Sequence, residues 1–141
     1  MRNKILLHIS IALLSFAFAN NNATAQCDTI ASICTKHLEN KFISDGQSYR
    51  SLLLEKEIAE FHATLFGGTT YRFSACSGIT DGNLIFSVYD KERNLLFKNS
   101  DFKNSPYWDF KISSTIECII EAELVSGNSS GCAVLLISFK Q

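Results

Sequence analysis

The residues whose types could support covalent chemistry are five cysteines and the two histidines that lie beyond the first 25 residues. A catalytic cysteine requires a histidine as its base and a partly exposed thiol in an electropositive setting. No local motif joins a thiol to His37 or His62, so only a contact formed by folding could pair them. The cysteines are Cys27, Cys34, Cys76, Cys118 and Cys132.

One serine motif also suggests catalysis. Gly127-Asn128-Ser129-Ser130-Gly131 matches the nucleophile elbow of hydrolases, in which a strand-to-helix turn exposes the serine to its base. The residues that follow, 132–139, have the composition of a strand, and no histidine lies beyond His62. We therefore interpret the motif as a polar hairpin loop and predict that the chain is not an enzyme.

Metal ligands are the next kind of site to consider. Neither histidine has a second histidine or a carboxylate at a spacing typical of zinc sites. Oxygen atoms of Asp81, Asn83, Asp90 and Glu92 flank one predicted strand and could hold calcium. Asp and Asn also bond to their own backbone in turns, which is the interpretation we favour. No metal or cofactor is predicted, and calcium remains the alternative.

The first 25 residues are typical of a signal peptide. A basic start with Arg2 and Lys4 precedes a run of apolar residues, and Ala23-Thr24-Ala25 suits signal peptidase. Cleavage would leave a mature chain of about 116 residues, enough for one compact domain. We expect this chain in the periplasm or outside the cell.

Two alternatives to cleavage fit the sequence less well. A retained membrane anchor needs about 20 uninterrupted apolar residues, whereas this run is shorter and contains His8. A lipid anchor on Cys27 would require a small residue where Gln26 stands. We therefore expect no membrane span after cleavage and a mature chain that starts near Gln26 or Cys27.

Charge argues against one class of partner. The leader carries two of the 13 basic residues and none of the 14 acidic ones, so the mature chain has a predicted net charge of about −3. Its lysines and arginines are scattered singly, without the basic stripe that neutralises a phosphate backbone. Nucleic acid is therefore not an expected partner.

In an oxidising compartment, five thiols allow at most two intramolecular disulfides. Cys118 lies on an apolar strand face, so we predict that it is a buried free thiol. Among the others we favour a Cys76–Cys132 disulfide, because both residues lie on predicted strands. A bond between Cys27 and Cys34 stays open if Cys27 precedes the helix, and an unpaired Cys27 could instead join two chains.

The N-terminal part of the mature chain predicts one short amphipathic helix. Residues 28–42 place apolar side chains on one face at a period of 3.6, and Asp45-Gly46 is a typical helix stop. Residues 49–66 are ambiguous between a helix and a strand. We favour a strand over residues 59–66, before the Gly67-Gly68 turn, and a short helical turn ahead of it.

The rest of the chain predicts strands. Alternating patterns bounded by turn residues cover 71–75, 84–89, 95–98, 107–112, 115–124 and 132–139. Residues 133–137 are apolar on both faces, which predicts a strand that is central or covered by the helix. The fold class is therefore mainly β, an antiparallel, jelly-roll-like β-sandwich with one N-terminal helix packed on it. The expected divisions are 1–25 (leader), 26–48 (helix and linker) and 49–141 (sandwich).

The aromatic segment 107–110 could contact a sugar. Alternation should turn Trp108 and Phe110 into the core and leave Tyr107 as a single exposed ring, with Tyr71 or Tyr89 available to complete a platform. The residues predicted to contact a ligand are Tyr107, Tyr89 and Asp90.

Three sequence segments resemble a known kind of module. Gly68-Thr69-Thr70-Tyr71-Arg72-Phe73, the segment from Gly82 to Asp90 and Leu95-Leu96-Phe97 are similar to secreted bacterial β-sandwich domains of the pre-peptidase C-terminal and GOLD types. The resemblance covers roughly residues 61–139. It implies a non-catalytic accessory or binding role, although the usual module is appended to a peptidase and this chain has none.

Together these expectations describe a non-enzymatic secreted β-sandwich protein that serves as a binding or structural accessory module of the bacterial envelope. Its expected partner is another macromolecule or a glycan at the envelope. The alternative is a carbohydrate-binding or calcium-dependent adhesion module of the same fold.

Overall fold

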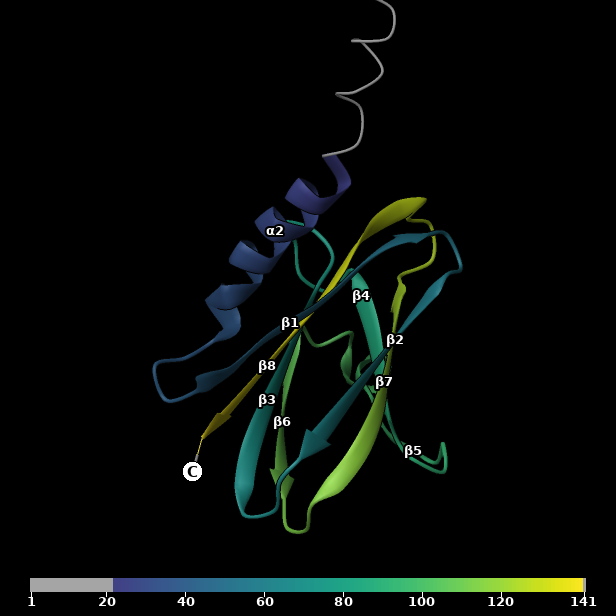
Figure 1. Ribbon diagram of the computed structural model, residues 1–141. Helices are drawn as coiled ribbons and strands as arrows, with labels where there is room; N and C mark the ends of the chain where they lie inside the picture. Colours follow the sequence, from purple (N-terminus) through teal and green to yellow (C-terminus); the bar gives the residue numbers. More distant parts are fainter. Residues whose placement is uncertain (1–21, 141) are drawn as a thin grey trace, which may run out of the picture.

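The computed structural model describes residues 22–140, with side chains from Gln26 onward, and shows a two-layer β-sandwich (Figure 1). Sheet A has the strand order β1-β8-β3-β6 and sheet B the order β2-β7-β4-β5, with every neighbouring pair antiparallel. The predicted fold class is confirmed. The elements are α2 (Asn22–Cys34), η2 (Thr35–His37), β1 (Ile43–Leu54), β2 (Ile58–Leu65), β3 (Thr69–Cys76), β4 (Leu84–Asp90), β5 (Leu95–Lys98), η3 (Asn99–Phe102), β6 (Tyr107–Ile112), β7 (Ile116–Leu124) and β8 (Ser130–Lys140).

The core lies between the two sheets and is built by alternate residues of each strand. Phe73 of β3, Phe86 of β4 and Ile120 of β7 are fully buried there. Trp108 and Phe110 of β6 also pack against this core, as their alternation predicted. Aromatic contacts between the layers, such as Phe73 with Phe86 at a centroid distance of 6.5 Å, hold the sheets together.

Helix α2 covers the outer face of sheet A. Its Ile30 and Ala31 form a second buried cluster with Val134 and Leu136 of β8. This arrangement explains why β8 is apolar on both faces: one face lies in the main core and the other lies under the helix. Within residues 22–140, no helix is long and apolar enough to cross a membrane.

The helix differs from its predicted bounds. It ends at Cys34 and is followed by the 3₁₀ turn η2, whereas a helix to residue 42 was expected. Asp45 and Gly46, predicted to stop the helix, lie in a bulge of β1 instead. Of the predicted signal peptide, residues 1–21 lie outside the described residues and 22–25 form the start of α2, so its cleavage stays a prediction.

The expected helical turn after residue 49 is wrong, because residues 43–54 form strand β1, paired with β8. β1 thus begins six residues before the expected start of the sandwich at 49. Its outward positions Leu52 and Leu54 are apolar although exposed, so the alternation that would mark a half-buried strand is missing from the sequence.

The predicted Cys76–Cys132 disulfide is not formed. Cys27 pairs with Cys132 and Cys34 pairs with Cys76, at Cα–Cα distances of 5.3 and 5.7 Å. The cause is the position of α2: cysteines seven residues apart lie on one helix face, which here is the face that contacts β8 and β3. Cys118 is buried in the main core and free, as predicted.

The serine motif, residues 127–131, spans the end of the β7–β8 connection and the first two residues of β8. The loop is followed by strand β8 and not by a helix, as predicted. It is not a hairpin, however, because β7 belongs to sheet B and β8 to sheet A, so the loop crosses between the layers. A nucleophile elbow has no structural basis at this position.

Disulfide connectivity gives the first prediction. Peptide mapping of the purified, oxidised protein under non-reducing conditions should recover the Cys27–Cys132 and Cys34–Cys76 links. The double variant Cys34→Ala/Cys76→Ala should lose about 2–5 kcal/mol of unfolding free energy, the usual cost of removing a native disulfide. Chemical denaturation followed by circular dichroism measures this loss.

A thiol assay provides the control for that experiment. Burial raises the pKa of the Cys118 thiol, so the native protein should be unreactive and the unfolded, unreduced protein should release one thiol equivalent. Three reactive thiols after unfolding, or a Cys76–Cys132 peptide, would contradict the observed pairing.

Candidate functional site: a groove between two edge strands

A groove enters the sandwich between β1 and β2. These strands are the edges of their respective sheets and follow one another in the chain. Tyr49 of β1 and Phe61 of β2 bring the two edges together, with ring centroids 5.5 Å apart. Beyond this contact the strands diverge (Figure 1) and leave a groove with a volume of about 570 Å³.

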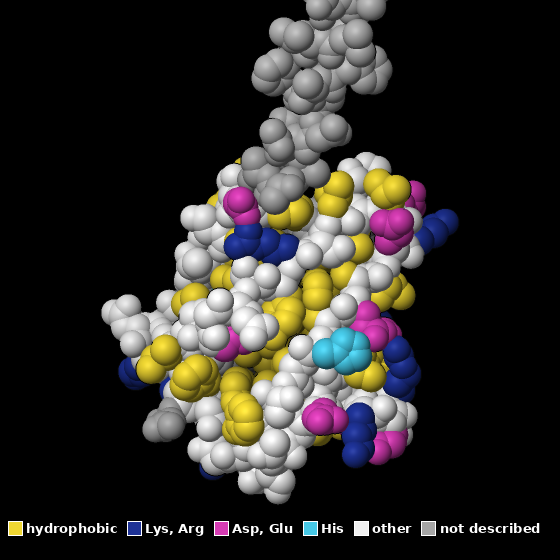
Figure 2. Space-filling view, in the orientation of Figure 1, with side chains coloured by type: hydrophobic (Ala, Val, Ile, Leu, Met, Phe, Trp, Pro, Cys, Tyr) yellow, Lys and Arg dark blue, Asp and Glu magenta, His cyan; other side chains and the backbone are white. Residues whose placement is uncertain are grey.

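The floor of this edge groove is apolar because it is the interior of the sandwich. Tyr71 of β3 and Ile137 and Phe139 of β8 line it from sheet A, and Leu65 of β2 lines it from sheet B. Figure 2 shows a band of hydrophobic side chains running down this face of the molecule. Apolar floors with a few polar groups at the rim are typical of binding sites.

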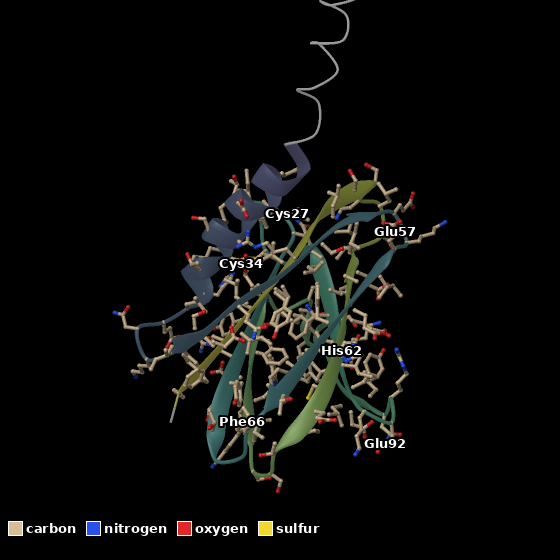
Figure 3. All side chains as sticks on the ribbon, in the orientation of Figure 1. Cys27, Cys34, Glu57, His62, Phe66 and Glu92 are labelled. Atoms are coloured by element: carbon tan, nitrogen blue, oxygen red, sulfur yellow. A yellow bond between two sulfur atoms is a disulfide. The ribbon has the colours of Figure 1, made fainter. Side chains whose placement is uncertain are left out.

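The rim of the groove is polar on both sides. Asp45 and Gln47 of β1 stand on one side, and His62 and Thr64 of β2 on the other. Figure 3 shows His62 and, at the end of β2, Phe66, whose side chain is 61% exposed. An exposed phenylalanine next to an open apolar floor enlarges the surface available to a ligand.

The bulge in β1 is the local feature that places Asp45 at the rim. Pairing with β8 shifts between Ser44 and Ser48, so that the intervening residues oppose a single position of β8. Gly46 has a φ of +81°, a conformation that favours glycine. The Gln47 N–H donates to Asp45 Oδ1 at 2.8 Å and fixes the carboxylate.

Asp45 is a half-buried carboxylate without an ion pair in the described part of the chain. Burial in the groove raises its pKa, because desolvation disfavours the charged form and the Gln47 hydrogen bond offsets only part of this effect. Burial, with a contribution from Asp45, also raises the pKa of the Tyr49 hydroxyl.

The predicted ligand-contact residues are not brought together. Tyr107 lies on the outer face of sheet A, where its ring contacts His37 at a centroid distance of 5.5 Å. Tyr89 and Asp90 lie at the end of β4 in sheet B, with Tyr89 on that sheet's outer face. Tyr71 is buried in the core. Tyr107 and Tyr89 therefore lie on opposite sides of the sandwich, and a contact role for each stays a prediction.

The four residues considered for calcium lie at the two ends of β4. Asp81 pairs with Lys36 Nζ at 2.8 Å, and Asp90 accepts hydrogen bonds from the Asn94 backbone and side chain. These bonds lower the pKa of Asp90, and they are the turn contacts expected from the sequence. Among the described residues, no group of three or more His, Cys, Asp or Glu could hold a metal ion.

The histidines do not meet the free thiol. His37 Nε2 lies 3.0 Å from Asp81 Oδ1, and His62 Nε2 lies 2.9 Å from Glu60 Oε1. Cys118 pairs in register with Ala63, so it points into the core while the neighbouring His62 points outward. No described residues form the cysteine–histidine pair that nucleophilic catalysis needs.

A buried arginine is the main feature that sequence reasoning missed. Arg72 of β3 is 5% exposed, and its Nε and Nη2 donate to Asp109 of β6 at 2.7 and 2.9 Å. Its guanidinium lies 4.3 and 4.5 Å from the ring centroids of Phe42 and Tyr107. Hydrogen bonding to Asp109 raises the pKa of the Arg72 guanidinium above its ordinary value. The residue fastens the segment after α2 to sheet A.

Comparison with known proteins gives a fold likeness only. Neither a protein family nor a curated protein sequence matches the chain. The structure is similar to a crystal structure of PliG from Aeromonas hydrophila, a periplasmic inhibitor of g-type lysozyme. The TM-score is 0.52 at 10% sequence identity, over 70% of this chain and 91% of that chain.

Asp45 generates a pH-dependent prediction. Its folded-state pKa is raised, so the stability it contributes is present at low pH and is lost as the pH rises through that pKa. Asp45→Asn keeps the acceptor for Gln47 and removes the charge. At pH 7 the variant should therefore melt at a higher temperature than the wild type. This difference in melting temperature should disappear as the pH falls below about 4. Calorimetry at several pH values measures this difference.

The matched control is Asp101→Asn, which alters an exposed carboxylate of η3 outside the groove. An Asp45→Asn variant that melts at or below the wild-type temperature at pH 7 would show that the groove does not desolvate this carboxylate.

Proposed function

We propose that the chain is a non-enzymatic binding protein of the cell envelope that holds a protein partner in the groove between β1 and β2. The observation that carries the proposal is the groove itself, in which the sandwich interior is open at one edge. Its apolar floor, with Tyr71 and Phe139, supplies contact area, while the rim supplies polar groups that can orient a ligand.

The two disulfides support an oxidising location, since such bonds persist outside the cytoplasm. The structurally similar PliG is a periplasmic inhibitor of g-type lysozyme, so a protein partner, and an envelope glycosidase in particular, is the first candidate here. Because that likeness concerns the fold alone, the partner and the mode of binding are proposals.

The carbohydrate-binding alternative has less support. Its aromatic platform required Tyr107 to share a face with another exposed ring, and Tyr89 lies on the opposite side of the sandwich. The resemblance to pre-peptidase C-terminal and GOLD-type modules likewise stays a prediction, and it would be compatible with a binding role.

A binding experiment tests the proposal. The mature chain, residues 26–141, is titrated into g-type lysozyme in a calorimeter and in a cell-wall lysis assay. We expect heat of binding and loss of lytic activity near equimolar concentrations. Phe66→Ser, which alters an exposed ring beside the groove, should weaken binding by about tenfold, the usual scale for an interface aromatic.

Leu96→Ser is the matched control, because this residue is similarly exposed but lies on β5 at the opposite edge of sheet B. A glycan array with and without a chelator is run in parallel. Glycan binding without any protein binding would replace the proposal with the carbohydrate alternative, and equal losses for both variants would move the site away from the groove.

A further inference from the structure

Among the described residues that line the groove, Asp45 is a carboxylate without an ion pair. Other acidic residues near the sheets, such as Asp81 and Asp109, are ion-paired with Lys36 and Arg72. Asp45 is partly desolvated and receives one backbone hydrogen bond. A partly desolvated carboxylate without a counter-charge attracts a cation more strongly than a fully hydrated one does, because less water screens it.

The surface next to this carboxylate is aromatic. Tyr49, Tyr71 and Phe139 line the groove, with Tyr71 and Phe139 at a centroid distance of 6.1 Å. Ring faces attract cations, and the alkyl stem of a lysine or arginine packs well on an apolar floor. A groove lined by both aromatic rings and a carboxylate is therefore complementary to a long basic side chain.

The same protein already contains an example of this recognition on the outer face of sheet A. There Arg72 lies against the rings of Phe42 and Tyr107 and forms two hydrogen bonds with Asp109. The groove offers the same elements, a carboxylate and aromatic rings, without the arginine. On the outer face of sheet A the chain itself supplies the arginine. In the groove, a partner would supply the basic side chain.

The strands that border the groove indicate the conformation of that partner. β1 and β2 each pair with one neighbour, so along their described lengths the other main-chain edge has no strand beside it. An unpaired edge presents N–H and C=O groups that an extended peptide can use. A helix could not make these main-chain bonds, and an acyl chain would leave Asp45 without a counter-charge.

From these contacts we infer that the groove binds an extended segment of a protein partner and takes one lysine or arginine side chain of that segment along Tyr49 and Phe139 to Asp45. The inference rests on the proposed function, because it assumes a protein ligand. It adds the chemical class of the residue that is recognised and its position in the groove.

Selection from a displayed library of random nonapeptides tests the inference. The immobilised mature chain should enrich peptides with a lysine or arginine at one fixed position by about tenfold over the library, as expected for a single partly buried charge pair. Asp45→Asn should lose this enrichment, and Asp101→Asn should keep it. Enrichment should also weaken at high salt, because the pair is only partly shielded from solvent.

Several results would overturn the inference. These are a library that yields no peptide, peptides without a basic residue, and a basic preference that survives Asp45→Asn. If the chain self-associates in sedimentation and Phe66→Ser abolishes this association, the groove belongs to a second copy of the chain. If the protein binds palmitate and the peptides displace it, the groove belongs to an acyl chain. The lysozyme titration uses a whole folded protein and therefore decides the proposed function separately.

Discussion

The two disulfides between α2 and sheet A are the constraint on which the rest of the structure depends. Cys27–Cys132 and Cys34–Cys76 fasten the helix along β8 and β3, the two central strands of that sheet. The helix thereby seals an outer face that would otherwise expose Val134 and Leu136. An ion pair between Asp28 of α2 and Arg50 of β1 adds a further link between the helix and the sheet. The groove between β1 and β2 opens instead into the main core, on the other face of sheet A.

Two aspartates of sheet A differ in whether the chain supplies a counter-charge. Asp109 is matched by Arg72, which is buried between aromatic rings and satisfied within the chain. Asp45 is partly desolvated in the groove and has no cation beside it in the described residues. Partial desolvation of the ionised carboxylate is unfavourable, and a cation supplied by a partner would offset it. This contrast is the physical basis for assigning the groove to a partner with a basic residue.

The sequence predicted those parts of the fold that depend on local alternation. The strands from Tyr71 onward, the inward direction of Trp108 and the burial of Cys118 followed from a period of two. Strand β1 did not, because its bulge at Asp45 breaks the period and its outward positions Leu52 and Leu54 are apolar.

The candidate site was beyond sequence reasoning for a different reason. A groove between edge strands depends on which strands end each sheet, and the disulfide pairing depends on where the helix lies; neither is a local property. The Arg72–Asp109 pair could have been proposed from the sequence, because the two residues are directly opposite in two strands that were both predicted.

The central claim is that the groove between β1 and β2 contacts a protein in the cell. A photo-crosslinking amino acid placed at position 66 in cells that make and export the chain tests this directly, with position 96 on the opposite edge as the control. The account predicts one defined crosslinked protein from position 66 and none from position 96. The yield of the position-66 product should fall with Asp45→Asn. Crosslinks from position 96 alone, or the same product from both positions, would contradict it.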